Sequence, residues 1–413
     1  MGCPGDLLGA EIIPTNLIWV MPAEGLHEMP SASPIAARTA PPAVAIIGGG
    51  VIGLSIGWRL RQAGCPVTIY ERGAAGKGAS WAAAGMLAAG IEAEPTEEKL
   101  FELGRYSQAL WPGFAAELEA ATGLGVGYDA TGTLVCAFTR DQAAKLQRGI
   151  EFQSRLGGVF DWLTGRAARE LEPGLAPNLV AAVLSRHDHQ VDNRLLGAAL
   201  EAAFRRSGGR LLTGTEAALD IEAGRVRGII AGEMRHDADI VVLAAGPWSR
   251  LVAGLPPGAA PPVRPLKGQM LALAMPPAAP LIRHVVWGAN CYLVPRADGR
   301  LLVGATTEER GFDTAMTAGG VLDLLDDAWR TLPGIEELAI QEMWTGFRPG
   351  SPDDMPILGP SAIDGLVFAT GHHRNGILLT PATAQLVADY VLSGQVDARM
   401  AAFGMDRFES GIK

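Results

Sequence analysis

The sequence has few cysteines, and none lies close to another. There is no C-x-x-C pair among the four: Cys3, Cys65, Cys136 and Cys291. This argues against a disulfide framework and a zinc site, and it fits free thiols in a reducing cytoplasm. The seven histidines also lack metal-ligand spacing. We therefore expect no metal, and a solvated turn from His187 to His189.

Clustered positive charge is also missing. Lys and Arg number 34 against 44 Asp and Glu, a net charge of −10, and they are scattered along the chain. A nucleic-acid-binding face needs clustered basic residues, so we expect no nucleic-acid partner. No apolar stretch reads as a membrane span, because Ile12 to Ala23 is too short and the uncharged run from Thr39 to Trp58 contains a glycine turn. Lys and Arg are absent before Arg38, which argues against a secretion signal and favours a cytoplasmic protein.

The N-terminal residues 1–41 are poor in helix signals, and we expect a disordered extension there. Met21 and Met29 are alternative starts. The remaining length is ample for two domains with substantial cores.

The stretch from Val44 to Glu71 is predicted to form one βαβ unit. Its glycines Gly48, Gly50 and Gly53 follow the G-x-G-x-x-G spacing at the junction of strand and helix. Such glycines permit a tight turn and backbone approach to a pyrophosphate, which then faces the helix N-terminus. Glu71 ends the second strand, where its carboxylate suits ribose hydroxyls and repels a 2′-phosphate. The pattern predicts FAD or NAD; a glycine-rich loop without ligand is the alternative.

The run from Arg72 to Leu87 consists mainly of small residues, which let backbone lie close to a large flat ligand. Ala79 and Ser80 can offer donors to phosphate, and Ala84, Gly85 and Met86 can pass beside a ring system. An ordinary helix start is the alternative.

Elements farther along the chain predict two kinds of sheet. The apolar run from Ile240 to Trp248 suits a strand at the centre of a parallel sheet, with Gly246 at its ligand end. Alternating patterns after Val263 suit an antiparallel sheet in a separate substrate domain. The predicted helices are Glu97 to Ala109, Phe114 to Ala121, Arg140 to Leu156, Asn193 to Ser207 and Leu322 to Arg330; the antiparallel strands are Gln269 to Leu273, Cys291 to Pro295 and Arg300 to Val303.

The last third contains a second glycine-containing loop, Gly371 to Gly376, between an apolar strand and a helix. Thr380 is predicted as the N-cap and Pro381 as the first residue of this helix, which should reach about Leu392. This arrangement would deliver a second helix N-terminus to the same ligand.

Six motifs together resemble the D-amino-acid-oxidase-type flavoproteins, and among them the glycine oxidases of the thiamine pathway: VAIIGGGVIGLSIGWRL, WAAAGML, CYLVPR, GRLLVGATTE, GFRPGSPDDMPILG and GHHRNGILLTPATA. The resemblance covers about residues 43–400. It implies a Rossmann-type domain holding non-covalent FAD, interleaved with an antiparallel-sheet α+β substrate domain. The implied bounds are 42–95, 185–255 and 340–395 for the FAD domain, 96–184 and 256–339 for the substrate domain, and 396–413 for a tail.

The resemblance also implies cofactor contacts. Pyrophosphate contacts are implied at Val51 and Ile52, ribose contacts at Glu71 and Arg72, and an adenine-side contact at Ala217. The residues implied beside the flavin are Ala79, Ser80, Ala84, Gly85, Met86, His372, His373, Arg374, Asn375, Gly376, Ile377 and Leu378.

For the substrate, the resemblance implies that Tyr292 and Arg348 hold a carboxylate and that Arg374 is a third site residue. Asn290 and Thr307 depart from the histidine and methionine expected there. The alternatives are a surface loop position for Arg348, an ordinary strand tyrosine at Tyr292, and for Arg374 a partner role to Asp353 or Asp354.

The implied reaction is oxidative deamination of glycine, sarcosine or small D-amino acids by hydride transfer from Cα to flavin N5. It needs orientation and no catalytic acid or base if the amine arrives neutral. With one dinucleotide fingerprint in the chain, the acceptor must be oxygen, giving hydrogen peroxide, or a quinone. Three hypotheses stay open: a glycine oxidase supplying imine for thiazole synthesis, a broader D-amino-acid or sarcosine-type dehydrogenase, and a non-catalytic FAD-binding subunit. We expect a homo-oligomer.

Overall fold

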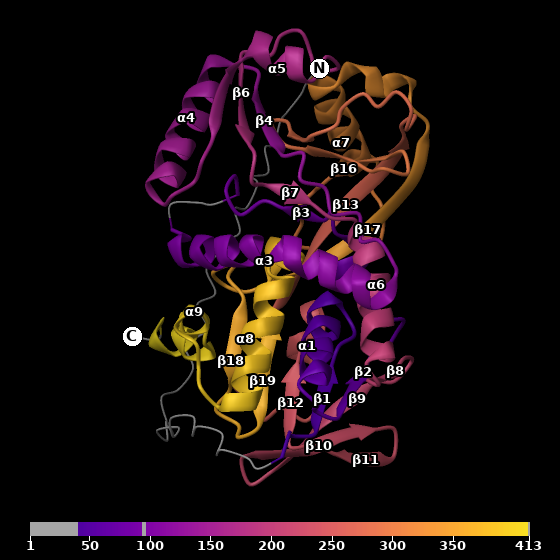
Figure 1. The fold of residues 1–413 in the computed structure, drawn as a ribbon, viewed down its shortest axis with the longest axis vertical. Helices are drawn as coiled ribbons and strands as arrows, with labels where there is room; N and C mark the ends of the chain where they lie inside the picture. The colour runs from indigo at the N-terminus through magenta and orange to yellow at the C-terminus, as the bar shows by residue number, and fades with distance from the viewer. Residues whose placement is uncertain (1–39, 93–95, 412–413) are drawn as a thin grey trace, which may run out of the picture. The chain divides into compact units, whose positions relative to one another are not determined.

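The computed structural model describes residues 40–92 and 96–411. The expected N-terminal extension therefore lies outside the described residues, apart from its last two. The fold class predicted from the sequence is confirmed, with a parallel sheet and a larger antiparallel-rich sheet (Figure 1).

The first sheet has six strands in the order β18 (Ile357–Pro360), β19 (Leu366–Thr370), β12 (Ile240–Leu243), β1 (Val44–Ile47), β2 (Val67–Tyr70) and β8 (Arg210–Leu212). All neighbours are parallel except β18 and β19. The fully apolar strand β12 lies between β1 and β19, as its composition predicted.

Both faces of this sheet are covered, which is why its central strands β1 and β12 are apolar throughout. Ile46 packs with the helix layer α1 (Val51–Gln62), α6 (Asn193–Arg206) and α8 (Thr380–Ser393). Ile47 packs on the opposite face, against the three-stranded sheet β9 (Ala217–Glu222), β10 (Arg225–Ala231) and β11 (Met234–Asp237). Successive strand residues point to opposite faces, so one short strand serves two cores.

The second sheet has eight strands in the order β17 (Ile340–Gly350), β13 (Arg264–Ala274), β16 (Arg300–Gly304), β15 (Tyr292–Pro295), β14 (Val285–Trp287), β4 (Thr133–Ala137), β6 (Ala181–Ser185) and β5 (Asp161–Thr164). Its neighbours are antiparallel except β4 and β14. The sheet also includes β17, although its residues 340–350 were expected in the FAD domain. Leu271 packs toward α7 (Ala318–Thr331), and Met270 faces the opposite side.

The insertion after residue 96 contains α3 (Glu98–Thr122), α4 (Arg140–Arg155) and α5 (Gly165–Leu171). The prediction of two helices on either side of Pro112 was wrong, because α3 continues through this proline. Trp111, Phe114 and Leu118 are buried on one side of the continuous helix, and this burial outweighs the lost backbone hydrogen bond. Figure 1 shows α3 crossing near α6 and α8.

The N-cap predicted at Thr380 was also wrong. The N-cap of α8 is Leu379, and Thr380 Oγ1 instead donates to the Gly376 carbonyl at 2.8 Å. The short 3-10 helix η3 (His373–Asn375) precedes α8, and Leu379 N–H already donates to the Asn375 carbonyl. The chain thus enters α8 through helical turns, so Thr380 lies inside the helix rather than before it. Pro381 does lie in its first turn.

The turn expected to be solvated at His187 to His189 contains a buried carboxylate. Asp188 is fully buried and accepts hydrogen bonds from Gly90 N, Ile91 N and Gln108 Nε2. His189 lies in β7 (His189–Gln190), which pairs with β3 (Met86–Leu87).

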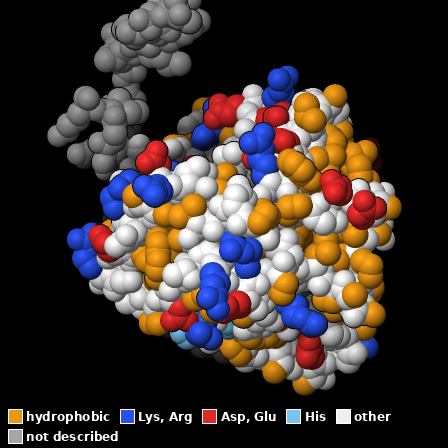
Figure 2. Space-filling model, turned by 90° about the horizontal axis from the view of Figure 1, so that it is seen from above, with side chains coloured by type: hydrophobic (Ala, Val, Ile, Leu, Met, Phe, Trp, Pro, Cys, Tyr) orange, Lys and Arg blue, Asp and Glu red, His pale blue; other side chains and the backbone are white. Residues whose placement is uncertain are grey.

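The remaining short elements are α2 (Ala79–Ala82), α9 (Ala398–Ala401) and the 3-10 helices η1 (Gly246–Leu251), η2 (Pro333–Glu337) and η4 (Met405–Gly411). Cys65, Cys136 and Cys291 are buried free thiols. On the face seen in Figure 2, basic side chains lie beside acidic ones, with apolar and neutral groups between them. Within residues 40–92 and 96–411, no helix is both long and apolar enough to span a bilayer.

Candidate active site

A cavity of about 930 Å³ runs between the two sheets and collects residues from distant parts of the chain. The predicted site residues that line it are Gly48, Gly50, Val51, Ile52, Glu71, Arg72, Ala79, Ser80, Ala84, Gly85, Met86, Ala217, Tyr292, Arg348, His372, His373, Arg374, Asn375, Gly376 and Ile377. The departures Asn290 and Thr307 line it as well. Of the predicted residues, Gly53 and Leu378 do not belong to the lining.

The glycines of the first loop are required by close backbone approach. A Cβ on Gly48, whose φ is +110°, would lie 2.3 Å from the Ala244 carbonyl oxygen. A Cβ on Gly53 would lie 2.0 Å from the Gly48 carbonyl oxygen, so this third glycine packs the helix against the turn. The N-cap of α1 is Gly50, which has no side chain to cap the helix, and the first N–H of the helix, from Val51, donates to Ser80 Oγ at 3.1 Å. The positive end of the helix dipole still faces the cavity and suits an anion.

Glu71 and Arg72 occupy one end of the cavity. Glu71 Oε2 accepts from Gly49 N at 2.7 Å and Oε1 from Gly73 N at 2.8 Å, which holds the carboxylate at the strand end. The Arg72 guanidinium carbon lies 3.9 Å from the centre of the Trp248 ring. A carboxylate beside the glycine turn is the arrangement that ribose hydroxyls need.

The loop before α8 places two histidines in the cavity wall. His372 is buried, and its Nε2 lies 3.1 Å from Thr383 Oγ1. Burial lowers the pKa of both His372 and His373 to about 3, so both are neutral at physiological pH. His373 has a φ of +44°, in the left-handed region that side chains rarely adopt. Leu378 is buried behind this wall, and its carbonyl accepts from Ser107 Oγ and Trp111 Nε1.

Tyr292 and Arg348 share one face of the eight-stranded sheet. Tyr292 on β15 pairs with Gly304 on the neighbouring strand β16, and a Cβ on Gly304 would lie 2.5 Å from the Tyr292 ring. Arg348 lies over Gly268 in the same way, because a Cβ there would be 2.7 Å from Arg348 Nη1. Two glycines thus leave room for the two side chains to lie along the sheet.

The environments of this pair suit anion binding. Arg348 Nη1 donates to the Thr306 carbonyl at 3.0 Å, which orients the guanidinium. Burial raises the pKa of Tyr292, and the nearby Arg348 charge opposes this shift, so the phenol stays protonated and can donate a hydrogen bond. The structure therefore brings Tyr292 and Arg348 together in the cavity. Arg348 lies on strand β17, so the alternative of a surface-loop position for it was wrong.

Arg374 reaches the cavity already paired. Its Nε lies 3.1 Å from Glu92 Oε2, and its Nη2 lies 2.8 Å from Glu97 Oε2. Asp353 pairs instead with Arg407, so the alternative that made Asp353 the partner of Arg374 was wrong. The Asp354 alternative was wrong too, since Asp354 Oδ1 lies 3.5 Å from His373 Nδ1 and the partners of Arg374 are Glu92 and Glu97.

Glu92 is a lining residue that sequence reasoning missed. Its side chain is 13% exposed. Burial raises the pKa of Glu92 to about 7, and the Arg374 charge only partly offsets this shift. The sequence signal was its position shortly after the small-residue run, since the charges that act on its pKa belong to the distant residues Asp188, Arg348 and Arg374. Trp248 and Phe347, also missed, add an aromatic wall.

These residues fit FAD. The glycine turn, the N-terminus of α1 and the Glu71 carboxylate match a dinucleotide, and the cavity continues from them to the Tyr292 and Arg348 face. Within the described residues, no group of His, Cys, Asp or Glu forms a metal site.

Comparisons with known proteins agree with this geometry. The family model described as FAD dependent oxidoreductase (DAO) matches residues 43–390. A glycine oxidase from Geobacillus kaustophilus is 39% identical over 370 residues, covering 88% of this chain and 96% of that protein. Its crystal structure superposes with a TM-score of 0.83 at 38% identity, covering 89% of this chain and 98% of that one.

The bifunctional protein ThiO/ThiG of Trichormus variabilis is 38% identical over 370 residues, covering 89% of this chain. The match takes in only 55% of that longer protein. Because the family model spans most of the sequence and the glycine oxidase is matched over nearly its whole length, the chain belongs to the DAO family of FAD-dependent oxidoreductases.

Proposed function

We propose that this protein oxidises glycine and other small amines, including sarcosine and small D-amino acids, and passes the electrons to oxygen. The single observation that carries the proposal is the continuity of the cavity from the Gly48 turn to Arg348 and Tyr292. The names of the glycine oxidase and ThiO/ThiG relatives support it, and they point to a role in supplying imine for thiazole synthesis.

The chain contributes orientation. Arg348 donates two parallel N–H bonds to the substrate carboxylate, and the Tyr292 hydroxyl donates a third. This three-point hold fixes Cα while FAD, when bound, supplies the hydride acceptor at N5. The neutral His372 adds no positive charge near the amine. The imine product then leaves and hydrolyses to glyoxylate and ammonia, or is consumed downstream.

The charges on the substrate side of the cavity are balanced while Glu92 keeps its proton. Arg348 supplies one positive charge to a carboxylate, and the charge of Arg374 is offset by Glu97. A substrate with one carboxylate therefore leaves no uncompensated charge, which favours monocarboxylic amino acids. Asn290 and Thr307 at the lining set the space beside Cα.

The test is peroxide release from purified, FAD-loaded protein given glycine, sarcosine or D-alanine. We expect peroxide with at least glycine, and flavin bleaching under nitrogen. Bleaching without peroxide would instead identify a quinone-linked dehydrogenase, and no bleaching with any amine would indicate a non-catalytic FAD subunit.

Arg348→Ala tests the clamp. The variant should keep bound FAD but raise the KM for glycine by about 100-fold, from the loss of charge-assisted hydrogen bonds of about 1.5–3 kcal/mol each. Arg166→Ala is the matched control, because the Arg166 side chain is 86% exposed and forms an ion pair with Glu170. Unchanged glycine kinetics in Arg348→Ala would remove Arg348 from the clamp.

A further inference from the structure

The cavity wall from Ser80 to Met86 is held from behind through its own carbonyl groups. Asn193 Nδ2 donates to the Ser80 and Trp81 carbonyls, both at 2.9 Å. Trp344 Nε1 donates to the Ala82 carbonyl at 3.1 Å. Buried carbonyls need partners, and here side chains from other elements supply them.

Arg296 makes the next contact along this wall. Its Nη2 donates to the Ala84 carbonyl at 2.5 Å and to Asn193 Oδ1 at 3.3 Å, and its Nη1 donates to Gln190 Oε1 at 2.7 Å. The Arg296 side chain is 4% exposed. The neighbouring Gly85 has no room for a side chain, because its Cβ would lie 2.8 Å from Arg296 Nη2.

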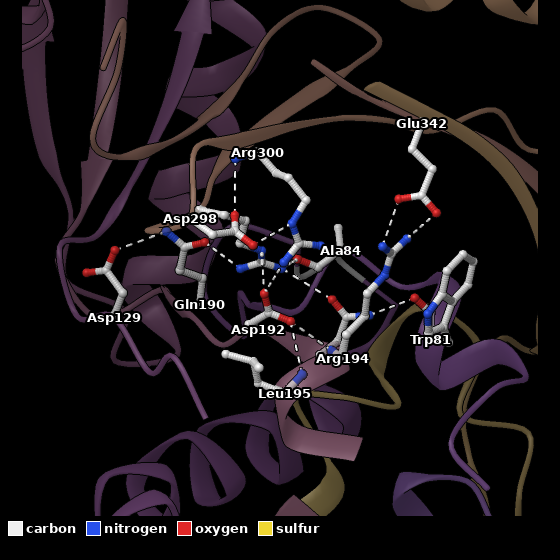
Figure 3. A network of polar contacts seen from close by, with 12 residues as sticks. Trp81, Ala84, Asp129, Gln190, Asp192, Arg194, Leu195, Asp298, Arg300 and Glu342 are labelled. Carbon is white, nitrogen blue, oxygen red and sulfur yellow. Dashed lines mark hydrogen bonds and ion pairs between the residues drawn. The ribbon is translucent and has the colours of Figure 1, made fainter. Parts of the chain in front are cut away.

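The charge of Arg296 is balanced by the cap of α6. Asp192 Oδ2 lies 3.9 Å from Arg296 Nε and accepts from Arg300 Nη2 at 2.6 Å, while Asp192 Oδ1 caps α6 through Leu195 N at 3.1 Å. Figure 3 shows Ala84, Asp192 and Arg300 converging in this network. Burial lowers the pKa of Arg296 only to about 10, so the guanidinium stays charged at neutral pH.

Arg296 also belongs to the strand hairpin that carries the substrate clamp. It follows β15, four residues after Tyr292, and its N–H donates to the Arg300 carbonyl to close the turn into β16. The rigid, planar guanidinium of Arg296 thus connects the wall at Ala84 and the helix α6 to the hairpin that carries Tyr292. Among the residues that the structure describes, Arg296 alone bonds both to the Ala84 carbonyl and within this hairpin.

We propose that Arg296 is a positioning residue that fixes the wall Ser80 to Met86 relative to Tyr292, and so sets the distance between the flavin ring and the clamped amino acid. The inference rests on the proposed function in placing the flavin beside Ala84 to Met86. Arg296 itself touches neither substrate nor reacting atoms; it acts through the backbone of Ala84.

The test compares Arg296→Lys with Arg300→Lys in the FAD-loaded enzyme. Lysine keeps the charge at position 296 but lacks the planar guanidinium that donates to Gln190, Ala84 and Asn193 at the same time. We expect FAD affinity, measured by fluorescence titration, to weaken about ten-fold, and the visible flavin spectrum to shift. The kcat for glycine should fall about ten-fold or more while KM changes less than about two-fold, because the clamp remains and only its placement is lost.

Arg300→Lys is the control because Arg300 shares the Asp192 partner but does not contact the wall. It should lower the melting temperature and leave FAD affinity, spectrum and kcat within about two-fold of wild type. If Arg296→Lys behaves in the same way as Arg300→Lys, the role is structural only and the proposal is overturned.

A milder variant covers the case in which Arg296→Lys does not fold. Gln190→Met removes the acceptor of Arg296 Nη1 and should change the flavin spectrum and kcat in the same direction, by a smaller factor. An unchanged spectrum and kcat there would overturn the proposal. FAD affinity and spectrum need no turnover, so a protein that binds FAD but oxidises no amine would refute the proposed function and still decide the role of Arg296.

Discussion

Glu92→Gln should make the protein more stable at neutral pH and make its stability less dependent on pH. The carboxyl of Glu92 is buried beside Arg374, and burial raises its pKa from 4.5 to about 7. The folded protein therefore keeps this proton over a pH range in which the unfolded chain has already released it. Stability linked to Glu92 is present below pH 4.5 and is lost as pH rises toward 7.

The size of the effect follows from the shift. Each pKa unit corresponds to about 1.36 kcal/mol, so a rise from 4.5 to about 7 gives about 3 kcal/mol of stability lost across that window. Glutamine has nearly the same shape and has no proton to lose, and the hydrogen bond from Arg374 Nη2 to the backbone carbonyl of residue 92 is unaffected by the substitution. The variant should therefore match wild type near pH 4.5 and exceed it by about 3 kcal/mol near pH 8.

The measurement is the melting temperature of both proteins at matched FAD loading between pH 4.5 and 8. The difference should grow with pH by about 3–5 °C. Glu309→Gln is the control for losing one carboxylate, because the Glu309 side chain is 73% exposed. A constant difference between Glu92→Gln and wild type at every pH would show that Glu92 ionises normally in the fold and would refute the reasoning.

Three further predictions concern the cofactor and the substrate. Gly48→Ala should weaken FAD binding at least about 100-fold by fluorescence titration, since the left-handed φ and the Cβ contact with Ala244 strain the turn by about 3 kcal/mol or more. Its control, Gly224→Ala, should bind FAD normally, because Gly224 also has a positive φ but its Cβ would meet no atom of the described residues within 4 Å. Tyr292→Phe should raise the KM for glycine about ten-fold and leave the flavin spectrum unchanged, as expected for one lost hydrogen bond to a carboxylate. Asn290→His should lower kcat/KM for sarcosine and D-alanine relative to glycine by about ten-fold, because a larger ring narrows the lining beside Cα; an unchanged ratio would place Asn290 away from the bound substrate.

Local features were predictable from the sequence. The Gly48 turn, its strands and α1 depend mainly on residues within about thirty positions, and Gly53 and Gly48 are required by a contact inside that unit and by one just after the neighbouring strand β12, respectively. The strand β12 was predictable for the same reason, because a strand that is buried on both faces is a short, continuous run of apolar residues in the sequence. Resemblance to known flavoproteins then carried the inference to Tyr292 and Arg348.

Long-range partnerships were not predictable. Asp188 looks like a loop residue between two histidines, yet it is buried because Gly90, Ile91 and Gln108 bring donors to it from distant positions. Glu92 is raised in pKa by burial that only the folded cavity creates. Pro112 predicts a helix end, and only the packing of the α3 surface shows why the helix continues.

The placement of the clamp follows from strand register. Across β17, β13, β16 and β15, Tyr292 pairs with Gly304, Gly304 with Met270, and Met270 with Trp344. Arg348 lies four residues after Trp344 on β17, and side chains at even separations share a face. A slip of one residue in any of these pairings would turn one member of the clamp to the opposite face, toward the core that α7 covers. The two side chains that we propose to bind the substrate are therefore held on one surface by backbone pairing over the whole sheet, and this supports the proposal that orientation is the chain's main contribution to the reaction.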